Sequence, residues 1–384
     1  GMINGLQRLN AIEKKQWQED LFLQWNETKN MNDTLYNSVL NTFEKIYNAY
    51  EEPYLAGQYW YEAIYATELM RQVYNYWKVI EDYELGNTEG AEEQLDKLAK
   101  GTSGFFKNFY LPVDREIFPG LMVAYKSNLP DKYHPSFFEE VLKKHNGDMT
   151  AFADKLYNST LFLDKDELEN LKDQPLKKVM RKLQRDDAMV IFKDFVGIYR
   201  MLVFPQLNQL ETELDSLYRI YITGLKKMYP DSVFSPDANF TMRVTHGEVM
   251  GYTPADGVEY EYYTTLAGVV EKDDPSIADY NVPAKLKQLY KNKDYGPYAQ
   301  NGEMRVCFIA TNHTSGGNSG SPVLNANGHL IGVNFDRNWE GTMSDIMYDP
   351  TQCRNITLDI RYALFIIDKF AGAGYLIDEM EIIQ

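Results

Sequence analysis

The segment "TSGGNSGSPVLNANGHLIGVNFDRNWEG" (314–341) decides the fold of the second half of the chain. Its Gly and Ser residues predict a tight turn around Ser319, and the alternating residues that follow predict two antiparallel strands. Asn327-Gly328 between these strands is the strongest short-range hairpin signal in the chain. A serine flanked by glycine on such a turn can project its hydroxyl while backbone N–H groups converge on one point. Acyl transfer requires this geometry of a nucleophile beside an oxyanion hole.

Further short strands are expected on both sides of this segment. Alternation and turn residues predict them in "FTMRVTHGEVMGY" (240–252), "VEYEYYTTLAGVVE" (258–271) and "RVCFIAT" (305–311). A final helix is expected over "TLDIRYALFIIDKFAGAG" (357–374), whose closing glycines indicate a C-terminal stop and not a phosphate-binding loop. These elements predict a β-rich domain over residues 230–384.

The first half of the chain has helical periodicity. Apolar residues recur three and four positions apart, as in "LYNSVLNTFEKIY" (35–47). The pattern continues over residues 174–229, where Pro205 should kink or divide the helix. We therefore expect an α-helical bundle over residues 1–229. The Tyr, Phe and Trp that cluster in this half are expected to form a helical core in which Tyr hydroxyls are solvated, and a carbohydrate or peptide platform is the alternative.

The composition is that of a folded protein with two domains. The chain has 384 residues, 44% hydrophobic and 25% charged, and its length exceeds what one hydrophobic core usually serves. No apolar run approaches the length needed to cross a bilayer, and no signal peptide opens the chain. The net charge of −17 argues against a nucleic-acid partner, because such binding needs clustered Lys and Arg.

The sequence contains no metal or cofactor motif. It has neither an H-E-x-x-H pattern nor a C-x-x-C pair, so we expect no metal and no cofactor. The two cysteines, Cys307 and Cys353, are too few for a disulfide scaffold. Whether they form a bridge stays open at this point.

The turn itself resembles a known signature. Gly317-Asn318-Ser319-Gly320-Ser321-Pro322 is similar to the G-D-S-G-G-P motif of chymotrypsin-like serine peptidases, with Asn and Ser replacing Asp and the fifth-position Gly. The resemblance implies an α+β multidomain fold in which residues 230–384 form an antiparallel chymotrypsin-like (trypsin-like) β-barrel with a C-terminal helix. It also implies that Ser319 is the nucleophile and that the N–H groups of Gly317 and Ser319 form the oxyanion hole. Asn318 departs from the motif, so activation by a freed N-terminus is not implied.

A wider resemblance covers essentially the whole chain. The segments "GGNSGSPV", "FDRNWEG", "SDIMYD", "DIRYALFIIDKFAGAG" and "PADGVEYEYYTT" resemble the bacterial dipeptidyl-peptidase 7 and dipeptidyl-peptidase 11 family. The resemblance implies release of dipeptides from peptides with a free N-terminus, a helical domain at 1–229 that covers the active-site cleft, and a periplasmic or secreted protein. It assigns the substrate's amine to Asp336 and the side chain at P1 to Arg337, where the dipeptidyl-peptidase 7 branch has Gly.

The chemistry of Arg337 supports an acidic P1 residue. A guanidinium beside the nucleophile can pair bidentately with Asp or Glu, and such a desolvated pair is worth about 2–5 kcal/mol. That energy would favour acidic P1 residues roughly a hundredfold or more. The alternatives are a surface Arg337 paired with Asp336 or Glu340, and an Asp336 that only shapes a turn.

The chain offers no obvious general base for Ser319. Of its five histidines, His313 lies six residues before the serine, a position that matches no base of chymotrypsin-like enzymes, so we interpret it as a cavity-wall or loop residue. The resemblance implies that the catalytic His and Asp precede residue 1. The chain alone would then be close to inactive, because loss of the base costs about a millionfold in turnover.

Two rival functions stay open. The first is a preference for apolar P1 residues, as in the dipeptidyl-peptidase 7 branch. The second is a peptide-binding module that keeps the β domain but has never had a base. The sequence also leaves a homodimer open.

Overall fold

The computed structural model describes residues 2–30, 33–234 and 241–383. The chain divides into two compact units, one formed by Phe22–Ser232 and the other by Gly1–Leu21 together with Val233–Gln384. We expected the first 21 residues to belong with the helices. They group with the sheet because Arg8 and Gly5 contact its loops, a long-range connection that helical periodicity cannot indicate.

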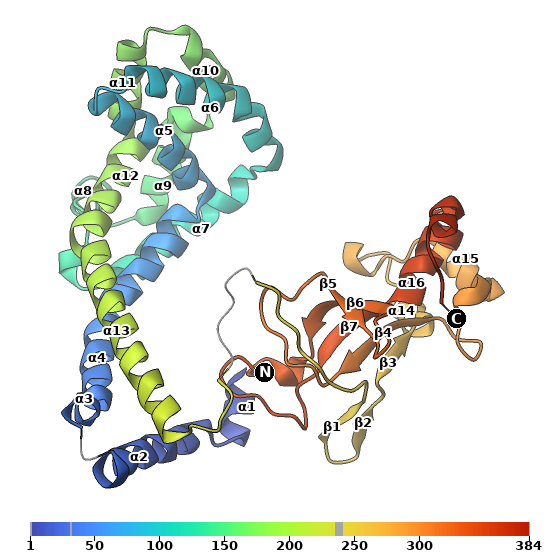
Figure 1. The fold of residues 1–384 in the computed structure, drawn as a ribbon. Helices are drawn as coiled ribbons and strands as arrows, with labels where there is room; N and C mark the ends of the chain where they lie inside the picture. The colour runs from blue at the N-terminus through green and yellow to red at the C-terminus, as the bar shows by residue number, and fades with distance from the viewer. Residues whose placement is uncertain (1, 31–32, 235–240, 384) are drawn as a thin grey trace. The chain divides into compact units, whose positions relative to one another are not determined.

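The helical unit is built almost entirely from α-helices joined by short 3-10 and π-helical turns (Figure 1). Helix α2 (Ala11–Lys29) enters it from the other unit. The remaining elements are α3 (Thr34–Asn37), α4 (Val39–Tyr59), η1 (Trp60–Tyr65), α5 (Glu68–Glu84), α6 (Thr88–Asn108), α7 (Leu111–Asn128), η2 (Asp131–Tyr133), α8 (Phe137–His145), α9 (Met149–Ser159), η3 (Leu161–Leu163), α10 (Lys165–Asn170), η4 (Leu171–Asp173), α11 (Leu176–Arg185), α12 (Asp187–Ile198), η5 (Tyr199–Val203) and α13 (Phe204–Met228).

Aromatic side chains fill the core of the helical unit. Tyr76 and Phe192 are fully buried within one large apolar cluster, and Trp60 stacks on Tyr199 with ring centroids 4.8 Å apart. Packing of this kind supplies most helical stability in proteins. Pro205 was expected to kink or divide the helix, and the π-helical turn η5, which ends at residue 203, does divide α12 from α13, with Pro205 in the first turn of α13 and the chain helical throughout.

The second unit contains a five-stranded antiparallel sheet of order β3-β4-β7-β6-β5 and a two-stranded ribbon, β1-β2 (Figure 1). Its strands are β1 (Tyr252–Ala255), β2 (Val258–Tyr260), β3 (Tyr263–Thr265), β4 (Arg305–Ala310), β5 (Ser321–Leu324), β6 (Leu330–Arg337) and β7 (Asn355–Asp359). Its helical elements are α1 (Met2–Arg8), α14 (Leu266–Glu271), η6 (Ala278–Tyr280), α15 (Ala284–Asn292), η7 (Gly296–Tyr298), η8 (Trp339–Gly341), α16 (Ile360–Phe365), η9 (Ile366–Phe370) and η10 (Gly374–Glu379).

The sheet is open among the described residues, so the antiparallel β-barrel that the resemblance implied is not confirmed. Strands β3 and β5 are its edges, and no described strand joins them. The segment over 240–252 was also expected to form a strand. Residue 240 lies outside the described residues, and between 241 and 251 the segment makes one bridge, Val249 to Ala310, before β1 begins.

The hairpin and the strand at 305–311 are confirmed. β5 pairs with β6, Gly328 in their connection has a φ of +83°, and β4 lies in the sheet. Two boundaries were wrong: the expected strand over 258–271 turns into helix α14, and the final helix starts only at Ile360 because residues 355–359 form β7. Apolar runs this short do not separate strand from helix by periodicity alone.

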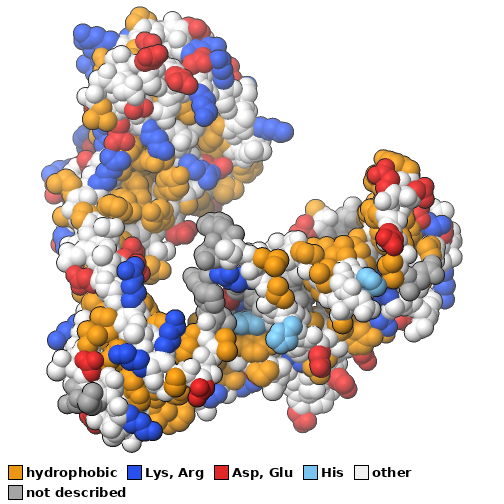
Figure 2. All heavy atoms as spheres, in the orientation of Figure 1, with side chains coloured by type: hydrophobic (Ala, Val, Ile, Leu, Met, Phe, Trp, Pro, Cys, Tyr) orange, Lys and Arg blue, Asp and Glu red, His pale blue; other side chains and the backbone are white. Residues whose placement is uncertain are grey.

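Other properties of the sequence have simple structural counterparts. Cys307 and Cys353 are both free thiols, which settles the bridge that the sequence left open. No helix in the described parts of the chain combines the length and apolar character that crossing a membrane would need. Figure 2 shows acidic and basic side chains interspersed on the visible face of the helical unit.

Candidate functional site

A short turn holds Ser319 at the entrance to β5. Asn318 accepts from the N–H of Ser315 at 3.0 Å through its side-chain oxygen, and its own N–H donates to the Ser315 carbonyl at 3.2 Å. Gly317 and Gly320 have φ of +102° and +81°, a region that favours glycine. Asn318 therefore shapes the turn through hydrogen bonds, and the two glycines allow its backbone path.

The turn is fastened to the neighbouring strand β6. The N–H of Gly320 donates to the carbonyl of Asn334 at 2.8 Å, and the buried Asn334 side chain donates to the carbonyl of Asn318 at 3.1 Å. Asn355 on β7 donates to the Asn334 side-chain oxygen at 2.9 Å. Two strands of the sheet thus fix the position of the serine.

Two backbone donors of the turn are unused. Among the described residues, the N–H groups of Gly317 and Ser319 donate to no other group, whereas those of Asn318 and Gly320 are both engaged. Ser319 is exposed, and its hydroxyl donates to the carbonyl of Phe335 at 3.0 Å. An accessible hydroxyl with two unused N–H groups beside it is the arrangement that an oxyanion hole requires.

A bulge in β6 lies directly opposite the serine. Asn334 pairs with Thr357 and Asp336 pairs with Ile356, so Phe335 is one extra residue in its strand. Bulges occur near active sites because they redirect side chains and carbonyl groups. This bulge presents the Phe335 carbonyl to Ser319 and places Asp336 and Arg337 at the adjacent end of the strand.

Arg337 is largely withdrawn from solvent and paired. Its Nη1 donates to Ser344 Oγ at 2.6 Å, and its Nη2 lies 3.0 Å from the carboxylate of Asp345. The side chain of Arg337 is 19% exposed. A narrow cavity is lined by Arg337 together with His313, Thr314, Ser344, Tyr348, Cys353 and Asn355.

Neither Asp336 nor Glu340 pairs with the guanidinium of Arg337. The exposed Asp336 accepts from the backbone N–H of Arg337 at 2.7 Å, which leaves its second carboxylate oxygen without a described partner. Glu340 accepts instead from the hydroxyl of Tyr252 at 2.6 Å. The alternative of a surface Arg337 paired with one of these two carboxylates is therefore wrong.

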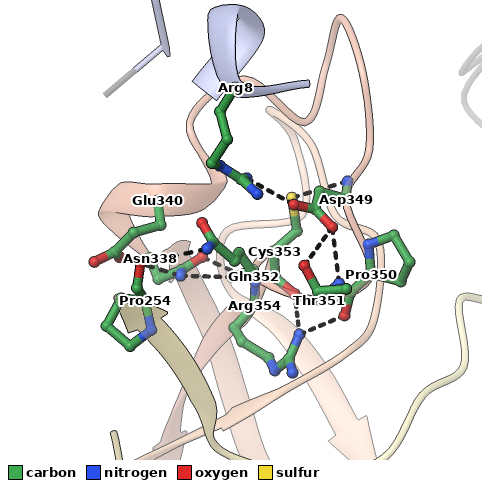
Figure 3. A network of polar contacts seen from close by, with 10 residues as sticks. All are labelled: Arg8, Pro254, Asn338, Glu340, Asp349, Pro350, Thr351, Gln352, Cys353 and Arg354. Atoms are coloured by element: carbon green, nitrogen blue, oxygen red, sulfur yellow. Dashed lines mark hydrogen bonds and ion pairs between the residues drawn. The ribbon is translucent and has the colours of Figure 1, made fainter. Parts of the chain in front are cut away.

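Buried polar contacts support the loop between β6 and β7. Asn338 accepts from the N–H of Arg354 at 2.9 Å, and its amide donates to the carbonyl of Gln352 at 2.8 Å (Figure 3). The guanidinium of the buried Arg354 donates to the carbonyls of Pro350 and Cys353 at 2.9 and 2.8 Å. These bonds close the loop that carries the partners of Arg337.

Helix α1 is tied to the same loop. Arg8 donates to the buried carboxylate of Asp349 at 2.6 Å, while Thr351 donates to the other oxygen of that carboxylate at 2.7 Å (Figure 3). Burial acts to raise the pKa of Asp349, but the hydrogen bonds from Thr351 and Arg8 outweigh it and hold this pKa below its usual range. Asp349 is therefore ionised at neutral pH and joins α1 to the loop.

No histidine in the described residues hydrogen-bonds to Ser319. His313 is exposed, packs against Tyr348 with ring centroids 4.7 Å apart, and lines the cavity beside Arg337. His329 lies in the hairpin near Asn325. No group of three or more His, Cys, Asp or Glu that could hold a metal ion occurs within the described residues.

Sequence reasoning missed several residues of the site. Asn334, Ser344 and Asp345 received no role, although the last two belong to the "SDIMYD" segment that helped to carry the family resemblance. Their partners, Asn318 and Arg337, lie seven to sixteen residues away. Only the fold of the loop brings them together, so no local pattern could have found them.

Comparison with known proteins identifies the family of the chain. The family model described as Peptidase S46 matches residues 1–382. An Asp/Glu-specific dipeptidyl-peptidase of Flavobacterium psychrophilum is 37% identical over 386 residues, covering 100% of this chain and 53% of that protein. A dipeptidyl-peptidase 7 of Phocaeicola vulgatus is 41% identical over 286 residues, covering 72% of this chain and 38% of that protein.

A solved structure is similar to nearly the whole chain. The crystal structure of Porphyromonas endodontalis DPP11 in complex with the dipeptide Arg-Glu has a TM-score of 0.83 at 32% sequence identity, covering 99% of this chain and 54% of that one. The chain therefore spans about half the length of the relatives that it matches. It has their helix-rich α+β fold. With a family model that matches nearly all of its length, the chain belongs to the peptidase S46 family.

Proposed function

We propose that this chain carries the nucleophile of a serine dipeptidyl-peptidase that releases N-terminal dipeptides with Asp or Glu at P1. One observation carries the proposal. An exposed Ser319 lies beside two unused N–H groups, and the partly shielded cation of Arg337 lies one residue beyond Asp336 on the adjacent strand. Nucleophile, oxyanion donors and a P1 cation therefore come from one turn and one strand.

The chemistry follows from these positions. Ser319 Oγ attacks the carbonyl carbon of the second substrate residue, and the N–H groups of Gly317 and Ser319 stabilise the oxyanion that forms. Collapse of this intermediate breaks the amide bond to the third residue, whose amine takes up the proton and leaves. The hydroxyl must first leave the Phe335 carbonyl and give its proton to a base. The family resemblance assigns that base, and the Asp that orients it, to residues that precede this chain. Water then hydrolyses the acyl-enzyme.

Asp336 and Arg337 account for substrate selection. The exposed carboxylate of Asp336 can pair with the free amine, which limits cleavage to the chain end, and Arg337 can pair with the acidic P1 side chain. Relatives named Asp/Glu-specific dipeptidyl-peptidase and DPP11 structures with the dipeptides Arg-Glu and Arg-Asp support this assignment. Gly317, Ser319, Asp336 and Arg337 form the proposed site.

The proposal extends to the whole protein. A chymotrypsin-like β domain at 230–384, a helical domain at 1–229 that covers the cleft, and a periplasmic or secreted location are supported by the family resemblance. The chain by itself should be nearly inactive if the base precedes it, as the family resemblance implies. Cell fractionation of the natural protein tests the location, and sedimentation velocity distinguishes one copy from the homodimer that the sequence left open.

The decisive experiment uses the full-length natural protein with dipeptidyl reporter substrates. P1 is Asp, Glu, Leu or Phe, and each substrate has a free or an acetylated amine. We expect fast release only from free-amine Asp and Glu substrates. Cleavage of acetylated substrates would indicate an endopeptidase, a preference for Leu or Phe would indicate the apolar specificity, and no cleavage would favour the peptide-binding module.

A further inference from the structure

The guanidinium of Arg337 has two partners that differ in burial. Ser344 is 5% exposed and accepts from Nη1 at 2.6 Å. Asp345 is bound to Nη2 at 3.0 Å, and its side chain is 50% exposed. The buried serine is fixed in the loop, whereas the carboxylate lies at the solvent side. One partner can therefore hold Arg337 in place while the other leaves.

Separating the Asp345 carboxylate from Arg337 costs little free energy. An ion pair with one exposed member contributes little, because water solvates the released carboxylate. Nη2 would be left unpaired in a side chain that is mostly shielded, so another carboxylate is the preferred replacement. The side chain of a P1 Asp carries the same carboxylate group as Asp345.

We propose that Asp345 is the resident counter-ion of Arg337 and that the P1 carboxylate of an acidic substrate displaces it. Asp345 is then a specificity-determining residue, because it competes with acidic P1 side chains and keeps Arg337 paired when an apolar P1 enters. This inference rests on the proposed function. The exchange breaks no covalent bond: the Asp345 carboxylate moves into water, and Nη2 donates to the substrate.

The two substrate classes should respond in opposite directions to Asp345→Asn. Removing the competitor lowers KM for Asp and Glu substrates by about two- to fivefold, the factor that an exposed ion pair is worth, with kcat changed by less than about twofold. For a Leu substrate, kcat/KM falls by a similar factor, because Arg337 is then unpaired beside an apolar side chain. A purely structural role would impair both classes together.

The test compares four forms of the full-length natural protein on free-amine reporters with Asp, Glu or Leu at P1. These are the wild type, Asp345→Asn, Asp345→Glu and the control Asp279→Asn. Asp345→Glu keeps a competing carboxylate, so its KM should stay close to that of the wild type. Asp279 is exposed in η6, outside the site, so its variant removes the same charge without the effect. Added salt should shrink the Asp345→Asn effect, because exposed pairs are screened.

The outcomes separate the two proposals. A wild type that does not cleave acidic substrates overturns the proposed function and this inference with it. If the wild type cleaves them and the KM of the Asp345→Asn variant for acidic substrates is unchanged or raised, only the inference is overturned. Parallel losses on Asp and Leu substrates would make Asp345 a structural residue of the loop, and that result also overturns the inference.

Discussion

Each of the two units of this chain is stabilised internally by a different kind of contact. The helical unit has an extended apolar cluster rich in aromatic rings and a smaller second one. The unit with the sheet has a much smaller apolar cluster and concentrates buried polar side chains between residues 334 and 359. These side chains are Asn334, Asn338, Ser344, Asp349, Arg354, Asn355, Thr357 and Asp359.

The two kinds of contact serve different purposes: the apolar core stabilises the fold, and the polar network positions the groups of the proposed site. An apolar core is non-directional and tolerates rearrangement, whereas a hydrogen-bonded network fixes positions but demands that each partner be present. The proposed site needs fixed positions for a serine, two N–H groups and a guanidinium. It is accordingly built on the polar network, and the aromatic core serves folding.

The largest expected effect is chemical and lies in the unit with the sheet. Ser319→Ala in the full-length protein should lower turnover by about a millionfold. Its melting temperature should change little, because the exposed hydroxyl makes one hydrogen bond to a neighbouring carbonyl. Kinetics on Asp reporter substrates together with thermal denaturation provide the check. A variant that keeps activity would remove the nucleophile from Ser319.

The next largest effect is on stability and comes from replacing Phe with Ala at a buried position, compared with the same replacement at an exposed position. Phe192→Ala in the aromatic core should destabilise the helical unit by about 3–5 kcal/mol, because it removes a fully buried ring. Phe335→Ala is the matched control, since residue Phe335 is 45% exposed, and it should cost less than about 1 kcal/mol. Denaturant unfolding measures both. Equal losses would contradict the idea that stability is concentrated in the helical core.

A smaller effect tests the polar network. Asn338→Ala leaves the N–H of Arg354 and the carbonyl of Gln352 without their partner, which should cost about 1–3 kcal/mol. The loop that carries Ser344 and Asp345 should loosen, so KM for acidic substrates should rise more than kcat falls. Hydrogen exchange over residues 338–354 reports the loosening. If exchange there is unchanged, the network does not hold the loop.

The smallest effect is on the pH dependence of folding stability, to which Asp186 and Asp349 should contribute with opposite signs. Burial raises the pKa of Asp186 in the helical unit above its usual range, despite hydrogen bonds from Leu161, Thr160 and Ala188. The stability linked to this group is present below its unfolded pKa and lost as pH rises through the folded value. The pKa of Asp349 is lowered, so its contribution is present above the unfolded pKa and lost as pH falls through the folded value.

Thermal denaturation between about pH 6 and pH 3 measures these trends. The stability difference between wild type and Asp186→Asn should move in favour of the wild type as pH falls. The stability difference between wild type and Asp349→Asn should move in favour of the variant as pH falls over the same range. Slopes of the same sign for both variants would mean that the two carboxyl groups do not have opposite environments.

Local patterns predicted much of the fold. The break before Pro205, the hairpin at Asn327-Gly328 and the strand at 305–311 were all readable, because each depends on residues adjacent in sequence. The β-barrel and the strand over 240–252 were not confirmed. Closure depends on whether distant edges pair, and alternation of side chains carries no information about that.

For this protein, the sequence by itself determined the two kinds of secondary structure, the turn that exposes Ser319, and the proximity of Asp336 and Arg337. Only the tertiary structure decided that Asn334 fastens the turn, that Arg337 pairs with Ser344 and Asp345, and that Arg8 reaches Asp349 across the chain. The physical reason is the separation along the chain between the residues that interact. Backbone propensities and turn chemistry act between neighbours, whereas an ion pair or a buried hydrogen bond forms only where folding has already brought its two partners together.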